Sequence, residues 1–400
     1  MAILYFIFVL VLLFLKITPF TLTAWSFLVW GFPMLFELEV SPAGLIYCSL
    51  VIACILSHIL YGKPVKIILI GDKYADSAFM LFAILTIIIL IRDVGFGGFL
   101  SGKYGPIPGG NIYLYYLWNS SLYIALCVHL FAHSFRRTRF LILVMSLLLL
   151  LISGDRTILG FVVILIAYRY SNGLVPLRFI AENKIRFLYF SLLAFLLFLG
   201  KDIYAGYASG LSIHQIYSSF NLKEILMRLE FWHIYGMINN IVENPPAGYE
   251  MKDMLASTFA FIPGSSILGI DPHEFSELIK YKFYNTWSDA SGVGASLIGE
   301  AFVAGGYLGL FLVGSIYLLS IFLLAKGISS RRQLISSISL ILLPLIVFYA
   351  HRNSLGQILS FTGRYVSLVL LIWLVAPLFR ARFSLSRLSC VRNIRCEELV

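Results

Sequence analysis

Long apolar stretches separated by short polar breaks run through most of this 400-residue chain. Many approach the roughly 20 residues that an α-helix needs to cross the hydrocarbon core of a membrane. They lack the alternation of apolar and polar residues that is typical of membrane barrel strands. Because a helix satisfies its own backbone hydrogen bonds in lipid, we expect an all-α polytopic membrane protein. The pattern predicts about 11 spans, at residues 2–16, 20–36, 43–61, 77–91, 112–132, 139–153, 156–169, 185–200, 293–324, 334–350 and 364–379.

One long polar interval, residues 200–292, interrupts this pattern. It holds many acids and histidines, interspersed with tyrosine and tryptophan. Titratable groups beside aromatic rings suit a polar, ring-shaped substrate. We therefore divide the chain into membrane helices at 1–199 (about eight spans), a large loop at 200–292, further membrane helices at 293–379 (about three spans) and a basic tail at 380–400.

Two segments, one inside this loop and one at its end, carry more specific patterns. Residues 222–243 have apolar positions at helical spacing and end at Asn244-Pro245-Pro246, which predicts an amphipathic helix in the loop, lying on the membrane surface. The apolar positions are 222, 225, 226, 229, 232, 236 and 237. The span that follows Ser291 is too long and too rich in glycine for one regular helix. We expect it to begin as a broken or re-entrant segment.

Composition and charge agree with a membrane protein and orient it. Hydrophobic residues make up 60% of the chain and charged residues 12%, which is too little charge to cover a soluble protein of this length. Of the 30 cations, 19 lie with only 5 acids in one set of loops and the tail, while the other 11 cations lie with 15 acids on the opposite side. The positive-inside rule then predicts a cytoplasmic C-terminus, a periplasmic N-terminus and a periplasmic 200–292 loop. The net charge of +10 comes from membrane-flanking loops and does not point to nucleic acid.

The sequence offers few signs of a cofactor or metal. It has no Walker loop, no Rossmann glycine pattern and no HExxH, and its five cysteines show no metal-ligand spacing. Glu37-Leu38-Glu39 has carboxylates spaced for a cation, although such a pair is usually only solvated. We expect neither a metal nor a cofactor.

Arginines at the predicted outer membrane edge are the first candidates for chemistry. Arg156 follows a tight polar turn, Ser153-Gly154-Asp155, between two apolar runs. It either pairs locally with Asp155 or grips a lipid phosphate, which suits the fork of donors on a guanidinium group. Arg92, Arg352 and Arg364 lie at similar edges, where a single arginine most often only anchors a helix.

Candidate proton carriers lie in and after the loop. Arg228 either pairs with Glu224 on the helix surface or faces a substrate, with Glu230 and His233 as possible proton carriers. Glu300 lies about ten residues into a predicted span, so it needs a partner, a cavity or the loop beside it. The candidate residues are, for catalysis, Arg156, Arg228, Glu230, His233 and Glu300, and, for substrate binding, Trp232, Tyr235, Lys280, Lys282, Asp289, Arg352 and Arg364.

Four segments together resemble the O-antigen polymerases of the Wzy type, which join lipid-linked oligosaccharide repeat units. They are SGDRTILGF (153–161), MRLEFWHIYGMINNIVENPPAGYE (227–250), FAFIPGSSILG (259–269) and SGVGASLIGEAFVAGGYLGLF (291–311). That family often has arginine after its Ile-Pro pair. This chain has Gly264 there, with Lys280 or Lys282 as the substitute cation.

The resemblance implies a metal-independent membrane glycosyltransferase of the type C class, in the bacterial inner membrane. It would transfer a glycan from a polyprenyl diphosphate to the sugar of an incoming lipid-linked repeat unit, at the periplasmic face. The implied partners are that lipid-linked oligosaccharide, the bilayer and a chain-length regulator protein. The rival readings are an O-antigen ligase, which transfers the glycan to lipid A-core, a flippase for lipid-linked glycans, and a structural partner in polysaccharide export.

Overall fold

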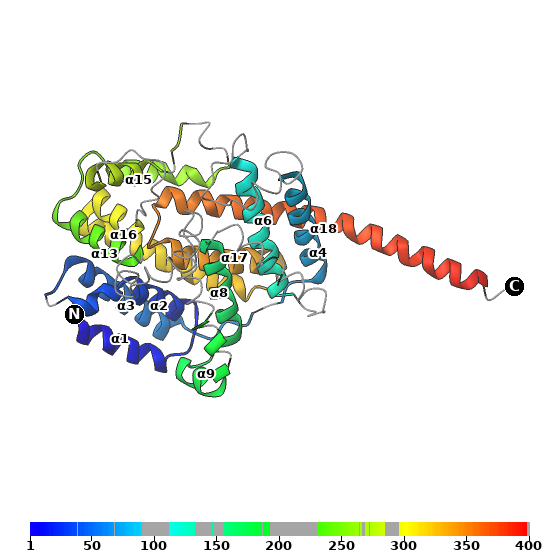
Figure 1. The fold of residues 1–400 in the computed structure, drawn as a ribbon, viewed down its shortest axis with the longest axis horizontal. Coiled ribbons are helices and arrows are strands. Elements are labelled where there is room, and N and C mark those ends of the chain that lie inside the picture. The colour runs from blue at the N-terminus through cyan, green and yellow to red at the C-terminus, as the bar shows by residue number, and fades with distance from the viewer. Residues whose placement is uncertain are drawn as a thin grey trace, which may run out of the picture. The chain divides into compact units, whose positions relative to one another are not determined.

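The computed structural model of the chain is helical throughout its described part, in which no β-strand occurs (Figure 1). The structure describes residues 1–37, 39–67, 69–89, 112–132, 144, 146, 156–185, 187–189, 191–192, 230–263, 265, 269–271, 273–284 and 296–397.

Most of the predicted apolar spans coincide with described helices. The exceptions are 139–153 and 185–200, which lie largely outside the described residues. The helices on the other predicted spans are α1 (Ala2–Phe14), α2 (Pro19–Trp30), α3 (Pro42–Tyr61), α4 (Asp72–Ile88), α6 (Ile112–Leu130), α8 (Arg156–Ser171), α16 (Leu297–Ile328), α17 (Gln333–Tyr349) and α18 (Leu355–Glu397).

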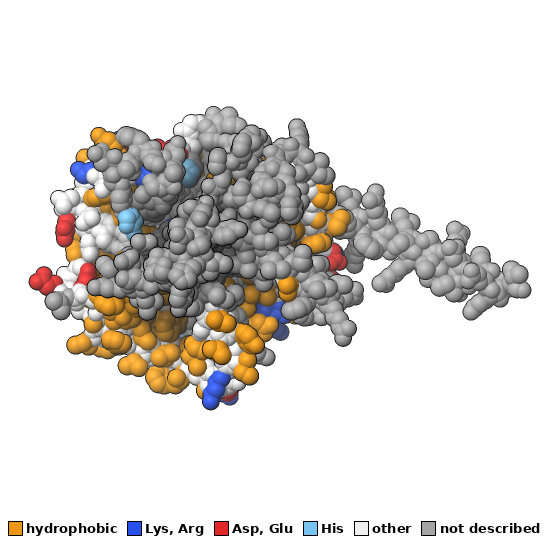
Figure 2. Space-filling model, in the orientation of Figure 1, with side chains coloured by type: hydrophobic (Ala, Val, Ile, Leu, Met, Phe, Trp, Pro, Cys, Tyr) orange, Lys and Arg blue, Asp and Glu red, His pale blue; other side chains and the backbone are white. Residues whose placement is uncertain are grey.

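The length and composition of these helices make the chain an α-helical membrane protein. Three described helices are long and apolar enough to cross a membrane: α3, α16 and the Leu355–Pro377 part of α18. A fourth candidate is a bent pair, Gly160–Ser171 with α9 (Pro176–Glu182), whose axes differ by 85°. Figure 2 shows hydrophobic side chains gathered over α1 and the helices beside it, as expected for a lipid-facing surface.

The described helices divide into two compact units. The first comprises 1–67, 163–329 and 339–363, and the second comprises 68–162, 330–338 and 364–400. In the first unit α2 packs along α3, and the loop helices α13 (Glu230–Glu243) and α14 (Met251–Ala256) both pack on α16. In the second unit α4 packs on α6, where the indole N–H of Trp118 donates to Thr86 Oγ1 at 2.6 Å.

Helix α13 confirms the predicted end of the amphipathic segment but not its environment. The helix ends at Glu243, directly before Asn244-Pro245-Pro246. Its buried face differs from the predicted one and contacts α2, α3 and α16, so protein covers it rather than the membrane surface. The buried residues are Ile234, Tyr235, Met237, Ile238 and Ile241.

Helix α16 is broken, as its glycine content predicts. Gly305 and Gly306 leave helical geometry, and Gly306 has φ +58°, a conformation that glycine adopts without a Cβ clash. The chain then doubles back so closely that a Cβ on Gly309 would lie 2.2 Å from the carbonyl oxygen of Ala301. The break separates a short first arm, 297–304, from a long second arm, 307–328.

Two predicted boundaries are wrong. Helix α16 begins at Leu297, so Glu300 lies in its first turn and not about ten residues into a span. Helix α18 begins at Leu355, so Gly363, Arg364 and Tyr365 lie inside it rather than at its start. Its backbone also continues through the predicted tail boundary at 380 to Glu397.

Candidate functional site

The side chain of Glu300 is fully buried and joins three segments of the first unit. Its Oε1 accepts a short hydrogen bond from the hydroxyl of Tyr249, which precedes α14. Its Oε2 accepts the backbone N–H of Leu355, the first residue of α18, at 2.5 Å. The sequence analysis required a partner for this carboxylate, and these are the partners that the described residues provide.

The position of Glu300 explains how a buried carboxylate is stabilised here without a guanidinium partner among the described residues. The first N–H groups of a helix have no acceptor within the helix, and the helix dipole favours negative charge at that end. Glu300 lies at the N-terminus of α18 and accepts one of these N–H groups. Burial, followed by the charge of Glu300, raises the pKa of Tyr249, so its hydroxyl remains a donor.

This geometry limits the chemistry that Glu300 can perform. Both of its carboxylate oxygens are already engaged, and neither is exposed to solvent. A general base needs a free oxygen within reach of the proton that it takes. The arrangement therefore suits a positioning role, in which Glu300 holds Tyr249 and the start of α18 together.

A second contact joins the loop to α18 beside Glu300. The side chain of Gln357 accepts the backbone N–H of Ser354 through Oε1 at 3.3 Å, and its Nε2 lies 2.7 Å from Nδ1 of His273. His273 precedes α15 (Glu274–Ile279), and its own N–H donates to Asp271 Oδ1 at 2.8 Å. The Gln357 side chain thus joins the residue before α15 to the first turn of α18.

The Phe-Ile-Pro element packs on the same helix. Phe261 is the last residue of the 3₁₀ helix η4 (Ser257–Phe261). A Cβ on Gly363 would lie only 1.8 Å from the carbonyl oxygen of Phe261. Only glycine permits this approach. Three parts of the loop, at Tyr249, Phe261 and His273, therefore contact the first turns of α18 or the carboxylate that caps it.

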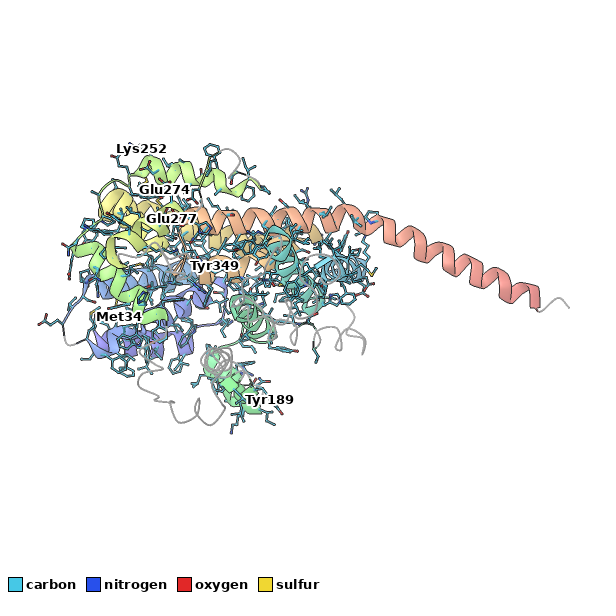
Figure 3. The ribbon with its side chains drawn as sticks, turned by 45° about the horizontal axis from the view of Figure 1, so that its top comes forward. Met34, Tyr189, Lys252, Glu274, Glu277 and Tyr349 are labelled. Carbon is cyan, nitrogen blue, oxygen red and sulfur yellow. The ribbon has the colours of Figure 1, made fainter. Side chains whose placement is uncertain are left out.

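Acidic side chains gather on the outer side of α14 and α15. Figure 3 shows Lys252 on α14 and Glu274 and Glu277 on α15 in the same upper region. Partial burial, with the charges of Asp253 and Asp271, raises the pKa of Glu274. Within the described residues, no three His, Cys, Asp or Glu side chains lie together as a metal site would require.

A stack of rings surrounds His351 in the turn between α17 and α18. The imidazole is nearly parallel to the rings of Trp30 and Tyr47, with ring centroids 5.5 and 6.1 Å away. Tyr47 in turn stacks on Tyr235 of α13. Burial lowers the pKa of His351 to about 3, so the ring is neutral. No local pattern in the sequence indicates this stack, because its members are far apart in the chain.

The stack ends at a small polar cluster near the start of α3. Tyr235 donates to Glu37 Oε2 at 2.7 Å, and Ser41 donates to the same oxygen at 2.6 Å. A Cβ on Gly44 would lie 2.8 Å from the Tyr235 hydroxyl, so the small residue leaves room for it. Tyr235, which the sequence suggests as a substrate-binding residue, is 3% exposed.

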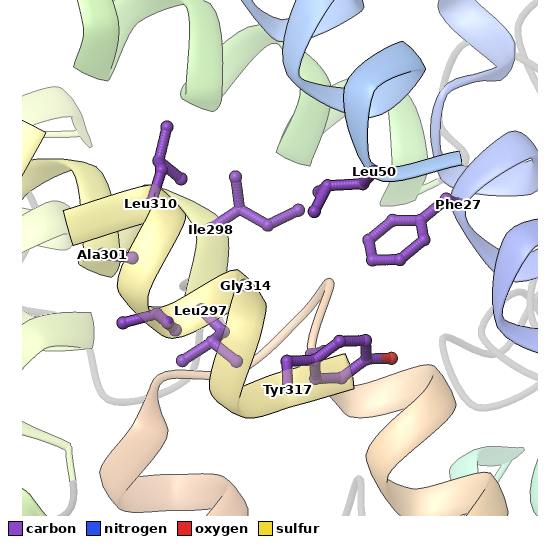
Figure 4. Close-up of a pocket in the computed structure, with 10 residues that line it drawn as sticks. Phe27, Leu50, Leu297, Ile298, Ala301, Leu310, Gly314 and Tyr317 are labelled. Carbon is purple, nitrogen blue, oxygen red and sulfur yellow. The ribbon is translucent and has the colours of Figure 1, made fainter. Parts of the chain in front are cut away.

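An apolar cavity of about 30 Å³ lies in the bend of α16 (Figure 4). Ile298 and Ala301 from the first arm face Leu310 and Tyr317 from the second, and Phe27 of α2 lies opposite. Its lining is almost entirely hydrocarbon. The other lining residues are Leu50, Leu297, Val313, Gly314 and Ala350.

The remaining predicted residues fall into two groups. In the first group, the structure does not describe the side chain. Arg156 begins α8 and Glu230 begins α13, and only their backbone is described. Arg228 and Asp289 lie wholly outside the described residues. The others are at least partly accessible. These are His233, Trp232, Lys280, Lys282, Arg352 and Arg364.

The candidate residues divide between the two compact units. Glu300, Arg352, Lys280, Lys282 and the α13 residues belong to the first unit. Arg156 and Arg364 belong to the second, where the Arg364 guanidinium lies 4.8 Å from the ring centroid of Tyr116. Trp232 packs on Phe36, with ring centroids 5.3 Å apart.

No protein-family profile, curated protein or solved structure matches the chain.

Proposed function

We propose that this protein polymerises lipid-linked oligosaccharide repeat units at the periplasmic face of the bacterial inner membrane. The observation that carries the proposal is the attachment of the polar loop to the membrane helices. Tyr249, Phe261 and His273 fix it to the start of α18 and to Glu300. A loop fixed in this way can hold a water-soluble glycan over a donor whose lipid tail stays in the bilayer.

The proposed reaction is a glycosyl transfer without a metal ion. A hydroxyl of the incoming lipid-linked repeat attacks the anomeric carbon of the growing glycan. The bond from that carbon to the polyprenyl diphosphate breaks, the diphosphate leaves with the electron pair, and the hydroxyl proton passes to a base. Arginine can stabilise the charge that develops on the leaving diphosphate.

The proposed roles divide between stabilisation of charge and transfer of the proton. Arg156 and Arg228 are proposed to stabilise the leaving group, and Arg352 and Arg364 to bind the donor diphosphate. His233 is exposed on α13, one helical turn or less from Glu230 and Trp232, so His233 and Glu230 are the proposed proton acceptors. Glu300 is proposed to position the loop and not to carry a proton.

The finer architecture belongs to the same proposal. It comprises about 11 spans, a periplasmic N-terminus, a cytoplasmic C-terminus and a glycosyltransferase of the type C class. The distribution of cations and acids along the sequence supports this orientation.

Arginine variants in cells test the proposal. Arg156→Ala and Arg228→Ala should abolish long polysaccharide chains and leave lipopolysaccharide capped by a single repeat, while the protein inserts at normal levels. Arg178→Ala is the matched control. Arg178 is exposed and bonded only to Glu182 among the described residues, at 2.6 Å, so chain length should stay normal. Normal chains in both test variants would refute the site, and a complete loss of glycan from lipid A-core would indicate a ligase.

A further inference from the structure

The side chain of Gln357 fixes the protonation state of His273. Its Oε1 faces the Ser354 N–H, which can only donate, so the oxygen must be the atom on that side. The amide nitrogen therefore faces His273 Nδ1 at 2.7 Å, and this nitrogen can only donate. It follows that Nδ1 of His273 accepts the hydrogen bond and carries no proton. The imidazole is in the neutral form with its proton on Nε2.

We propose that His273 is a positioning residue whose contact with Gln357 holds the start of α15 against the first turn of α18, and that protonation of His273 releases it. Helix α15 follows His273 and runs directly into the Lys280–Lys282 turn, the first turn of the π-helix η6 (Lys280–Tyr284). A proton on Nδ1 turns the acceptor into a donor and places two donors against each other. Rotation of the Gln357 amide would relieve this conflict only by turning its nitrogen toward the Ser354 N–H.

His273 lies among charged and titratable groups. Its backbone N–H already binds Asp271, and the acids of α15 follow it directly. The groups on the same segment as His273 are Asp271, Glu274, Glu277 and Lys280. The groups on neighbouring elements are Tyr249, which precedes α14, Asp253 on α14 and Glu300 on α16.

The role as a contact does not depend on glycan chemistry, whereas the functional role of the Lys280–Lys282 turn rests on the proposed function. The primary experiment therefore measures structure. Hydrogen exchange of the backbone amides of α15 is followed in the full-length protein in lipid nanodiscs at pH 7.5 and pH 5.5, with correction for intrinsic exchange rates. At the lower pH we expect exchange of the wild-type α15 amides to be about two- to tenfold faster, as the loss of one hydrogen bond implies.

Two variants test the direction in which pH changes the protection of α15. In Gln357→Glu, the carboxylate accepts from both the Ser354 N–H and a protonated His273, so protection of α15 should be stronger at pH 5.5 than at pH 7.5. In His273→Gln, the side-chain oxygen accepts the Gln357 amide at both pH values, so protection should not change with pH. Wild-type protection that is independent of pH, or a Gln357→Glu variant that loses protection on acidification as the wild type does, would overturn the proposal.

Activity provides the second measurement. Polymer formation by the wild type should fall between pH 7.5 and pH 5.5, and His273→Gln should show a weaker fall. If exchange follows these expectations but no variant forms polymer, the proposed function fails and the contact stands. If polymer forms but exchange does not respond to pH, the contact fails and the proposed function stands.

Discussion

At the scale of single residues, Glu300 shows how a membrane protein holds a buried carboxylate. The group accepts one phenol O–H and one helix-terminal N–H. The sequence predicts that Glu300 needs a partner, because the cost of an unpaired charge in hydrocarbon is large. It does not predict which partner, since Tyr249 and Leu355 are each about 50 residues away and neither belongs to a motif with Glu300.

Substitutions of Glu300 should separate a positioning role from proton transfer. In Glu300→Gln, the amide oxygen can accept the Leu355 N–H and the amide nitrogen can donate to Tyr249, so both contacts survive. Glu300→Leu leaves both donors buried without an acceptor, at a cost of about 1–3 kcal/mol for each. Thermal unfolding in detergent should show a small loss for the first variant and a large one for the second.

Activity of the same variants provides the contrast. Glu300→Gln should retain most polymer formation, because a positioning role requires hydrogen bonds and not a proton. Full thermal stability with no polymer would show instead that Glu300 carries a proton. Tyr249→Phe, which removes one of the two donors, should fall between the two Glu300 variants in stability.

Glu274 gives a pH dependence with a definite sign. Its pKa is raised in the folded protein by partial burial and by Asp253 and Asp271. A raised acid pKa contributes stability at pH values below the ordinary range of glutamate, near 4.5, and this contribution is lost as the pH rises through the folded value. Glu274→Gln should therefore match the wild type in unfolding temperature near pH 4 and exceed it at pH 7. An identical difference at both pH values would contradict this account.

At the scale of elements, apolar patterns located helices better than they located helix faces and ends. The apolar runs predict α1, α3 and α17 closely, because a membrane helix must be apolar along its whole length. The predicted apolar face of α13 differs from its buried face, because the helix packs on α2, α3 and α16, which the local pattern does not contain. The predicted start of α18 lies nine residues too late. The first turns of this helix contain polar residues, and Glu300 and Gln357 accept backbone N–H groups at its start.

The break in α16 should depend on Gly309. A Cβ there would meet the Ala301 carbonyl oxygen at 2.2 Å, which the backbone cannot relieve without opening the bend. Gly309→Ala should therefore lower the thermal stability of the protein strongly, by roughly 1–3 kcal/mol as overpacked sites do. Gly314→Ala on the same arm is the control, because its Cβ would lie 3.7 Å from Leu50 Cδ2, an ordinary contact. Equal stability of the two variants would argue against a tightly closed bend.

At the scale of the whole molecule, charge is the property of the sequence that predicts how the chain is oriented in the membrane. The described helices identify a membrane protein, and the loop charges predict which side each connection occupies. The arginines of the proposed site could be predicted only as a list. Its members lie in two units and in undescribed segments, and hydrophobic periodicity does not specify how distant helices pack.

Cysteine labelling tests this orientation. Lys282→Cys and Arg178→Cys each place a thiol at an exposed position, in a background where Cys390 and Cys396 are replaced by serine. A membrane-impermeant maleimide applied to cells with a permeabilised outer membrane should label position 282 and leave position 178 unlabelled until the inner membrane is opened. The reverse pattern would contradict a periplasmic loop.

The central claim is polymerisation from a lipid-linked donor, and reconstitution tests it most directly. The purified protein, in liposomes that contain a chelator and no nucleotide sugar, is supplied with a polyprenyl diphosphate-linked repeat unit of defined length. The account predicts a ladder of glycans that differ by one repeat unit, each still linked to polyprenyl diphosphate, with polyprenyl diphosphate released at each step. A donor that stays at one repeat, in liposomes where the protein is folded and correctly inserted, would contradict it.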